Sequence, residues 1–325
     1  MDKAKLMNGV KKYTMIIVLV LVTLFFTWQT GGKILLPQNV SNLISQNAYV
    51  FVLATGMLLC ILTGGNIDLS VGSVVCFAGA VGATLMESKG MNPWAASIMM
   101  LLIGLLIGAW QAFWIAYVHV PPFITTLSGM LVFRGLSNVV LNGLTVSLTN
   151  AGFVKVFGGG AECYIPDFFG GNGFNITCML VGVIACVIYV LVQIKNRMNR
   201  AKKGYEMEAL SAMVVRTVII CAVILVFMFR LAQYKGIPTA LVWVALVVLI
   251  YGYITSKTTT GRYFYAVGGN EKATKLSGIN TNKVYFLAYL NMGLLAAIAG
   301  MVTMARLNSA NPQAGTNFEM DAIGA

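Results

Sequence analysis

One acidic residue, Asp68, lies between two long apolar segments, within the stretch Gly64–Ser73 (GGNIDLSVGS). A carboxylate at membrane depth is costly unless it is paired or hydrated, so such a residue commonly marks a functional site. A structural role is the alternative, because Asp68 or Ser70 could cap a helix that begins near Val71. A helix that is capped by these residues and lies beside a route for solute through the membrane would satisfy both interpretations. The candidate pathway residues here are Gly65, Asn66, Asp68 and Ser70.

A second interruption lies at residues 119–122, where Pro121 and Pro122 end one helix and suit the first turn of the next. In the following helix, one arc of the helical wheel is polar and contains Ser128, Arg134, Gly135, Asn138 and Asn142. Arg134 should pair with a carbonyl, a carboxylate or water, and we expect a structural clamp rather than a substrate contact. Broken helices at 64–70 and 119–122 are typical of transport pathways, with ordinary tight turns as the alternative. The candidate residues are Pro121, Pro122, Ser128, Arg134 and Asn138.

A third motif lies in the segment 256–283, which separates two further apolar runs. Asn270 predicts a helix N-cap, Glu271 lies at the positive end of the helix dipole, and Lys275 lies near its negative end. Gly278 predicts the stop. A short rigid helix of this kind suits docking to a partner, and a solvated connector is the alternative. The candidate docking residues are Gly261, Arg262, Gly268, Gly269, Asn270, Glu271, Ala273 and Gly278.

The elements that position these motifs are long apolar helices. Of the 325 residues, 58% are hydrophobic and 10% are charged, and the mean hydropathy is +0.81. An average soluble domain is about 45–50% apolar and about 25% charged. The composition therefore excludes a soluble enzyme and predicts an all-α, polytopic transmembrane bundle. Nine apolar segments are expected to span: Tyr13–Trp28, Tyr49–Thr63, Val71–Met86, Trp94–Val118, Phe123–Leu141, Ile176–Ile194, Val214–Leu231, Thr239–Thr255 and Tyr285–Ala305.

The distribution of basic residues predicts the orientation. With a cytoplasmic N-terminus and nine crossings, most of the 22 Lys and Arg residues lie inside, in clusters at Lys3–Lys12, Lys195–Arg216 and Lys257–Lys283. Adding or removing one span would place a large basic cluster on the wrong side. The segment 256–283 is then cytoplasmic, and the long, Gly-rich segment 142–175, which has few apolar anchors, is external.

Several motifs that would indicate catalysis are absent. The sequence has no P-loop, H-E-x-x-H, G-x-S-x-G or CxxC motif and a single histidine, so we expect no enzymatic activity, cofactor or metal. Uphill transport would then need energy from a partner or an ion gradient. No dense basic patch with interleaved aromatic residues favours nucleic-acid binding. A Cys163–Cys178 disulfide is possible if the segment 142–175 faces an oxidising compartment.

Four stretches resemble the permease subunits of bacterial ABC importers for monosaccharides, the ribose, xylose and galactose type. They are Gly64–Ser73, Val120–Gly135, Thr258–Ile279 and Ala305–Ala325. The resemblance implies an inner-membrane permease that works with cytoplasmic ABC ATPase subunits, an extracytoplasmic sugar-binding protein and a second permease chain, which we expect to be identical. It also implies that 256–283 carries the coupling helix.

Members of that family usually continue past the position of Ala325, so we expect residues 1–325 to form a single permease domain that is truncated at its C-terminus. A permease for branched-chain amino acids and a stand-alone channel are the alternative functions.

Overall fold

The computed structural model describes residues 3–160, 162–171, 173–204 and 209–325 and, for residues 3–13, the backbone only. Thirteen α-helices account for most of this described part, and its two short strands, β1 (Val146–Ser147) and β2 (Ser309–Ala310), pair antiparallel. The chain forms two compact units, Met1–Leu43 with Pro166–Ile237 and Ile44–Ile165 with Pro238–Ala325. The all-α prediction is confirmed.

The first unit contains few internal contacts beyond a helical pair. Its elements are α1 (Lys3–Gln29), the 3-10 turn η1 (Lys33–Leu35), the start of α2 (Pro37–Leu62), α7 (Ile176–Lys202) and α8 (Leu210–Ala232). Asn175 caps α7 by accepting from the Cys178 N–H at 2.8 Å. The Cys178 thiol donates to the Met228 carbonyl at 3.4 Å, which ties α7 to α8.

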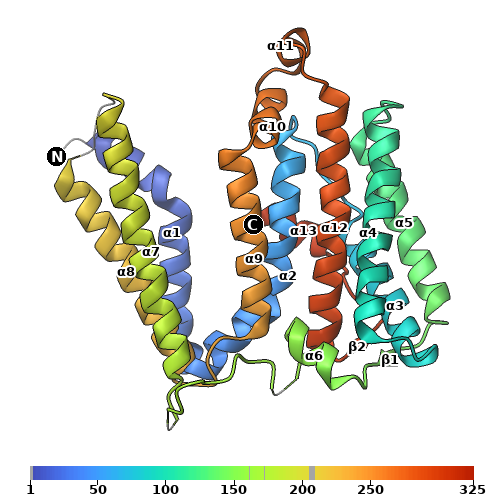
Figure 1. Cartoon of the computed structure of the whole chain (residues 1–325), viewed down its shortest axis with the longest axis horizontal. Helices are drawn as coiled ribbons and strands as arrows, with labels where there is room; N and C mark the ends of the chain where they lie inside the picture. The colour runs from blue at the N-terminus through green and yellow to red at the C-terminus, as the bar shows by residue number, and fades with distance from the viewer. Residues whose placement is uncertain (1–2, 161, 172, 205–208) are drawn as a thin grey trace. The chain divides into compact units, whose positions relative to one another are not determined.

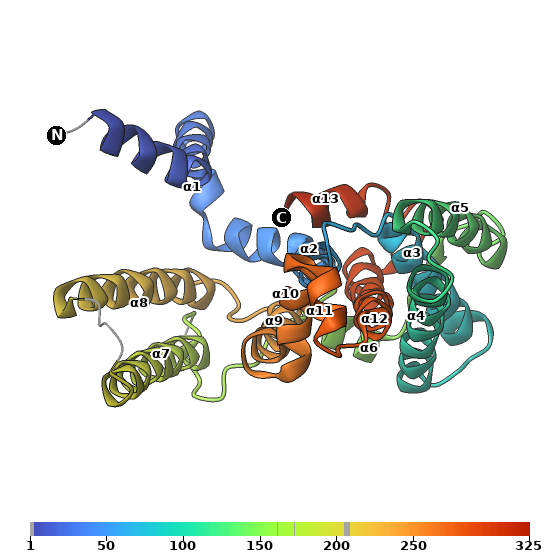
Figure 2. The same cartoon turned by 90° about the horizontal axis from the view of Figure 1, so that it is seen from above.

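The second unit is built around α12. Its long elements are α3 (Val71–Ala83) with the π-helical turn η2 (Thr84–Ser88), α4 (Pro93–Ala116), α5 (Pro122–Val140), α9 (Thr239–Lys257) and α12 (Thr281–Leu307). Figures 1 and 2 show α12 between α4 and the α9–α10 pair. A Cβ at Gly104 would overlap the Gly293 carbonyl, and one at Gly293 would overlap that of Gly104. These glycines let α4 and α12 approach closely, as small residues do between membrane helices.

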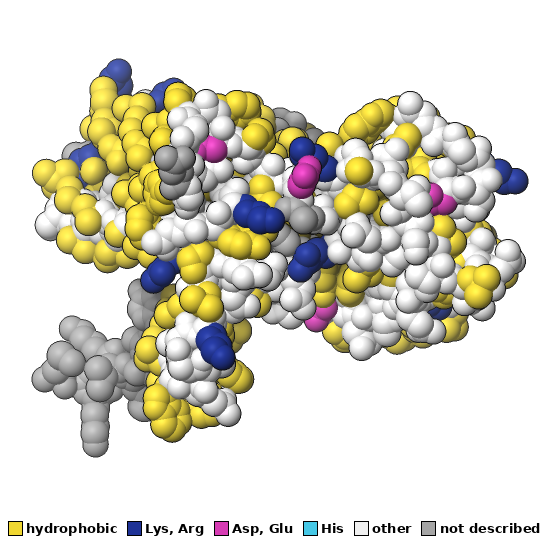
Figure 3. Space-filling view, turned by 90° about the horizontal axis from the view of Figure 1, so that it is seen from below, with side chains coloured by type: hydrophobic (Ala, Val, Ile, Leu, Met, Phe, Trp, Pro, Cys, Tyr) yellow, Lys and Arg dark blue, Asp and Glu magenta, His cyan; other side chains and the backbone are white. Residues whose placement is uncertain are grey.

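Short elements lie at the two ends of the second unit. The helices α10 (Thr259–Gly269) and α11 (Glu271–Leu276) lie at one end, whereas α6 (Ala151–Phe157), β1 and β2 lie at the other (Figure 1). The last helix is α13 (Phe318–Gly324). Figure 3 views the whole chain from below and shows Lys and Arg side chains at separate places on that face, not in one patch.

Eight helices in the described part are long and apolar enough to cross a membrane. They are Pro37–Leu62, Val71–Ser88, Pro93–Ala116, Pro122–Val140, Ile176–Lys202, Leu210–Ala232, Thr239–Lys257 and Thr281–Leu307. A shorter apolar helix, Thr14–Gln29, corresponds to the first of the nine segments expected from the sequence. About 20 residues span the hydrocarbon core, so the chain is a multi-pass membrane protein.

Two segments differ from the sequence-based description. Within 256–283 the structure has two helices: α11 is the predicted short capped helix, and α10, which directly follows α9, was not predicted. The segment 142–175, of which residues 161 and 172 lie outside the described part, has more apolar anchors than expected, because Phe153 and Phe157 of α6 are buried. No disulfide joins Cys163 and Cys178: the Cys163 thiol donates instead to the Gly160 carbonyl.

Candidate translocation site and coupling element

The interruption between α2 and α3 turns into the second unit instead of running over its surface. Gly64 and Gly65 both have positive φ, 102° and 80°, which few residues other than glycine adopt readily. The Gly65 N–H donates to the Ile61 carbonyl at 2.7 Å, and the Asn66 side chain donates to the Thr63 carbonyl at 2.9 Å. Gly64 and Gly65 are exposed, Asn66 and Ile67 are half-buried, and Asp68, Leu69 and Ser70 are buried before α3 begins. We call residues 63–70 the buried break.

A hydrogen-bonded group of three side chains holds the end of the buried break. Asp68 is 2% exposed, Ser70 is fully buried and Gln111 of α4 is 1% exposed. The Ser70 N–H and hydroxyl both donate to Asp68 Oδ1, at 2.8 and 2.6 Å. The Gln111 amide donates to Ser70 Oγ at 2.8 Å. The structure thus links the buried break to α4 by polar contacts inside the apolar unit.

The predicted helix start has the right position, and of the two candidate caps Asp68, not Ser70, accepts a backbone N–H there. Ser70 is the N-cap residue of α3, but its side chain makes no capping hydrogen bond. Its hydroxyl is engaged by Asp68 and Gln111 instead. Gln111 was not selected from the sequence, and the only signal for it was an amide inside the long apolar run of α4. A lone amide in such a helix needs a buried partner.

The second interruption has a different environment. Residues Tyr117, Val118, His119 and Pro121 are exposed, and His119 has a φ of 61°. Pro121 occupies the N-cap position of α5 and Pro122 its first turn, as the sequence predicted. We call residues 117–121 the exposed break.

The polar stripe of α5 does not join the Asp68 group. Ser128 and Asn138 are exposed, whereas the buried face of α5 is formed by Thr125, Thr126, Gly129, Phe133 and Ser137. Of the stripe residues, Arg134 has a well-defined role. Its guanidinium donates to the Pro312 and Ala314 carbonyls, at 3.2 and 2.6 Å. These contacts with backbone carbonyls are those of the expected clamp, and they hold the segment before α13 against α5.

The same C-terminal segment makes a close backbone contact beside the buried break. A Cβ at Gly72 would overlap the Gly315 carbonyl, and a Cβ at Gly315 would overlap the Gly72 carbonyl. Gly315 has a φ of 72°. The first turn of α3 therefore packs against backbone and leaves no room for a side chain at either position.

The capped helix α11 has the predicted local structure. Asn270 accepts from the Ala273 N–H at 3.0 Å, Glu271 lies in the first turn and Lys275 in the last. Gly278 has a φ of 82° just beyond the C-cap. The Thr274 hydroxyl contacts the Ala266 carbonyl of α10 at 2.8 Å, and the Tyr285 hydroxyl of α12 donates to Glu271 at 3.0 Å. These contacts fix α11 on α10 and α12.

One apolar residue of α11 faces outward. Leu276 is 89% exposed at the end of the helix, and Ala273 is also exposed. The sequence motif selected the polar caps and missed Leu276, because helical periodicity cannot assign a buried face to a six-residue helix.

The helix α10 touches the end of α2. A Cβ at Gly268 would overlap the carbonyl of Leu62, the last residue of α2 before the buried break. A Cβ at Gly261 would overlap the Ile254 carbonyl of α9. A Cβ at Gly269 would meet no atom within 4 Å, and Arg262 is exposed. Of the predicted docking residues, Gly261 and Gly268 therefore pack α10, and the others lie at the surface.

A hydrogen-bonded carboxylate organises the segment before α7. Asp167 accepts from the N–H groups of Phe169, Gly171, Ile176 and Thr177 and from the Thr177 hydroxyl, at 2.8–3.2 Å. Desolvation raises the pKa of this carboxyl, but the hydrogen bonds outweigh it and hold the pKa well below its ordinary value.

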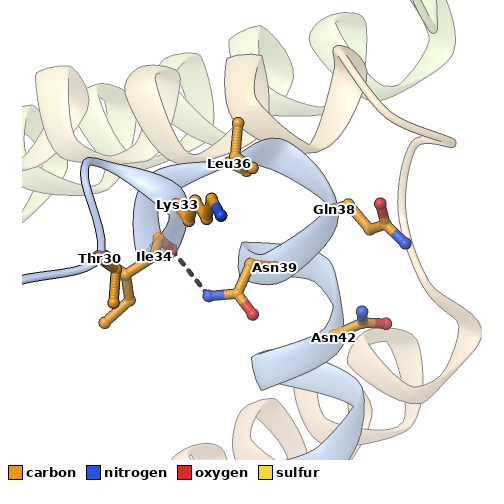
Figure 4. Close-up of a pocket in the computed structure, with 7 residues that line it drawn as sticks. All are labelled: Thr30, Lys33, Ile34, Leu36, Gln38, Asn39 and Asn42. Carbon is orange, nitrogen blue, oxygen red and sulfur yellow. Dashed lines mark hydrogen bonds between the residues drawn. The ribbon is translucent and has the colours of Figure 1, made fainter. Parts of the chain in front are cut away.

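The first unit has a polar pocket of about 410 Å³ at the turn from η1 into α2. Lys33, Gln38, Asn39 and Asn42 are among its lining residues (Figure 4), and Asn39 donates to the Ile34 carbonyl at 3.0 Å. None of the residues selected from the sequence lies in it. Within the described residues, no group of three His, Cys, Asp or Glu side chains is placed to hold a metal ion.

The fold and these sites define a multi-pass membrane protein with a buried polar break and a rigid exposed helix at one end. Residues 39–210 and 154–325 match the family described as branched-chain amino acid transport system / permease component. The chain belongs to this family of permease components. No solved structure gave a significant match.

Curated relatives extend over most of the chain. It is 37% identical over 313 residues to the xylose transport system permease protein XylH of Escherichia coli K12, covering 96% of this chain and 76% of the relative. It is 36% identical over 325 residues to the protein of the same name from Haemophilus influenzae, covering 100% and 83%. The ribose import permease protein RbsC of Escherichia coli K12 is 33% identical over 287 residues, covering 88% and 67%.

Proposed function

We propose that this chain is the permease subunit of an ATP-driven importer of monosaccharides in the bacterial inner membrane. The similarity over 96% of the chain to a xylose permease carries the proposal. Pentoses are the first solutes to test, because the relatives are named for xylose and ribose. Branched-chain amino acids, which the family description names, are not favoured, since the relatives reported above carry sugar names.

The orientation and the partners follow from the charge distribution and the resemblance. The N-terminus is cytoplasmic, which places α10 and α11 in the cytoplasm beside the basic residues of 257–283. Cytoplasmic ABC ATPase subunits supply the energy, an extracytoplasmic binding protein delivers the sugar, and a second copy of this chain completes the pathway.

The helix α11 is the contact for the ATPase. Its apolar Leu276 projects outward, while hydrogen bonds through Thr274 and Glu271 keep the helix fixed on its neighbours. An exposed apolar anchor on a rigid element fits a groove in a partner, because little ordering entropy opposes docking.

Motion of α11 reaches the membrane through α10. Gly268 contacts the Leu62 carbonyl at the end of α2, and the buried break begins at the next residue. ATP binding by the partner shifts the equilibrium between two conformations of the permease. In this mechanism the buried break, including Gly65, Asn66, Asp68 and Ser70, changes its packing between outward and inward access.

The experiment is uptake of labelled D-xylose and D-ribose by cells that express this chain with its ATPase and binding protein. Leu276→Asp should abolish both co-purification of the ATPase and uptake, while Lys272→Ala on the same exposed helix should preserve both. Uptake without any ATPase would favour the stand-alone channel and contradict the proposal.

A second pair of variants tests the transmission step. Gly268→Ala should lower uptake at least tenfold, because its methyl group overlaps the Leu62 carbonyl, and Gly269→Ala should leave uptake unchanged, because that position is open. The ATPase should co-purify with both variants. Equal uptake by the two variants would show that the contact of α10 with α2 does not transmit the motion.

A further inference from the structure

The second unit contains a polar cavity that none of the motifs above includes. It has a volume of about 330 Å³, within the range of about 300–1,000 Å³ typical of small-molecule sites. Its walls come from α2, from the C-terminal part of α12 and from the segment 313–318. It lies where α12 ends, near Leu307, and therefore at the end of the unit opposite α11 and on the predicted external side.

The lining carries hydrogen-bonding groups whose capacity is not used. The Thr303 hydroxyl is buried and has no hydrogen-bond partner among the described residues, and Thr303 is 8% exposed. Among the described residues, the Arg306 guanidinium has no hydrogen-bond or ion-pair partner. Gln46 and Gln313 add side-chain amides. A buried polar group without a partner destabilises a fold, so a ligand that supplies the partner is favoured.

An aromatic wall closes one side of the cavity. The rings of Tyr49 and Phe318 stack with centroids 3.6 Å apart and an interplanar angle of 14°. The Tyr49 hydroxyl donates to Asp321 at 2.7 Å, which fixes the ring. No Asp or Glu is among the described residues that line the cavity. The site therefore combines amide, hydroxyl and guanidinium groups with a flat apolar surface, and it bears a positive charge without a carboxylate.

We propose that the cavity bounded by Thr303, Arg306, Gln313 and Tyr49 is a subsite for a neutral monosaccharide. A sugar presents several hydroxyl oxygens to hydrogen-bond donors such as Arg306, and its C–H faces pack on aromatic rings. The occupant would lie beside Thr303, whose hydroxyl has no partner among the described residues. This inference rests on the proposed function, because it names where the transported sugar contacts the permease after its delivery.

The first experiment measures protection of an introduced thiol. Gln313→Cys places an exposed cysteine at the cavity, and Gln233→Cys places a matched exposed cysteine outside it. Both are labelled with a methanethiosulfonate reagent in membranes that contain the complete transporter, with the chain without an introduced cysteine as background. D-Xylose or D-ribose should slow labelling of Gln313→Cys at least twofold and leave Gln233→Cys unchanged. No protection by either sugar, or equal protection by L-leucine, would overturn the proposal.

The second experiment separates a role in sugar contact from a structural role. Thr303→Val removes a hydroxyl that has no partner, so thermal stability should stay equal or rise. Uptake should nevertheless fall about tenfold, the effect of one lost hydrogen bond, and Thr303→Ser should restore it. Arg306→Gln should give a similar loss.

Normal uptake by both Thr303→Val and Arg306→Gln would reject the cavity as a subsite and leave the proposed function intact. Absence of pentose uptake by the complete wild-type transporter would instead reject the proposed function.

Discussion

The two interruptions of the helical pattern have similar sequence signals and different surroundings. The buried break, residues 63–70, ends in Asp68 and Ser70, which are almost inaccessible and bound to Gln111. The exposed break, residues 117–121, is an open turn between α4 and α5. A helix breaker between apolar segments therefore does not by itself place irregular backbone inside the bundle. A polar partner on a neighbouring helix makes the difference.

The breaking residues explain part of the contrast. Gly64 and Gly65 adopt positive φ, which turns the chain back into the unit. Pro121 and Pro122 fix φ near −65° and start the next helix at once. Buried irregular backbone must then find hydrogen-bond partners. Asp68 Oδ1 accepts from the Ser70 N–H, and the Ser73 hydroxyl donates to the Ser70 carbonyl.

The largest effect is expected from Gly72→Ala, next to the buried break. Its methyl group would overlap the Gly315 carbonyl, and backbone cannot move aside at low cost. We expect the free energy of unfolding to fall by about 3 kcal/mol, at the upper end for overpacking. Unfolding in an SDS titration measures the change. Gly135→Ala in α5, where nothing lies within 4 Å, is the matched control and should be neutral or slightly stabilising.

A smaller loss is expected from Asp68→Ala. The variant leaves the Ser70 N–H buried without its acceptor, and such a group typically costs about 1–3 kcal/mol. We expect a loss of about 2 kcal/mol in the same SDS titration. Asp68→Asn retains an oxygen acceptor and should lose less than half as much. If the two variants were equally unstable, the negative charge rather than the hydrogen bonds would stabilise the buried break.

Arg134→Gln tests whether the helix after the exposed break depends on a single clamp. The guanidinium bonds two carbonyls of the segment 312–314, and hydrogen bonds to a charged group contribute about 1.5–3 kcal/mol. Because Arg134 is half-buried, we expect a loss of about 1.5 kcal/mol, together with faster hydrogen exchange in residues 311–317. Unchanged exchange there would mean that Gly72 and Gly315 hold the segment without Arg134.

The smallest effect is expected from His119→Gly in the exposed break. Glycine relieves the positive φ of 61° but gives the unfolded chain more freedom. The two terms oppose each other, so the thermal midpoint should correspond to a change within about 0.5 kcal/mol. A loss as large as that of Asp68→Ala would show that the exposed break is as constrained as the buried one.

Much of the local structure follows from the sequence. Asn270 and Gly278 delimit α11 because capping preferences act over a few residues. The apolar segments predict the membrane spans because the length and hydropathy of a continuous segment can be read directly from the sequence. Arg134 was expected to act as a clamp, since a guanidinium inside an apolar helix must find acceptors, but its partners near Ala314 could not be named.

The remaining features depend on tertiary contacts. Gln111 lies 41 positions from Ser70, and only the packing of α4 brings the two together. Gly261 and Gly268 lie inside α10, which ends at Gly269, and the two inner glycines pack against the backbone of α9 and α2. The polar stripe of α5 was assigned from periodicity alone, which cannot say that the opposite face packs inward.

The outward position of Leu276 also bears on the lifetime of the protein in the cell. In the proposed complex the ATPase covers Leu276, so a chain made in excess of the ATPase would leave this apolar side chain exposed. Chaperones and proteases recognise such exposed apolar groups. Abundance of the permease should therefore track synthesis of the ATPase, and surplus copies should be degraded.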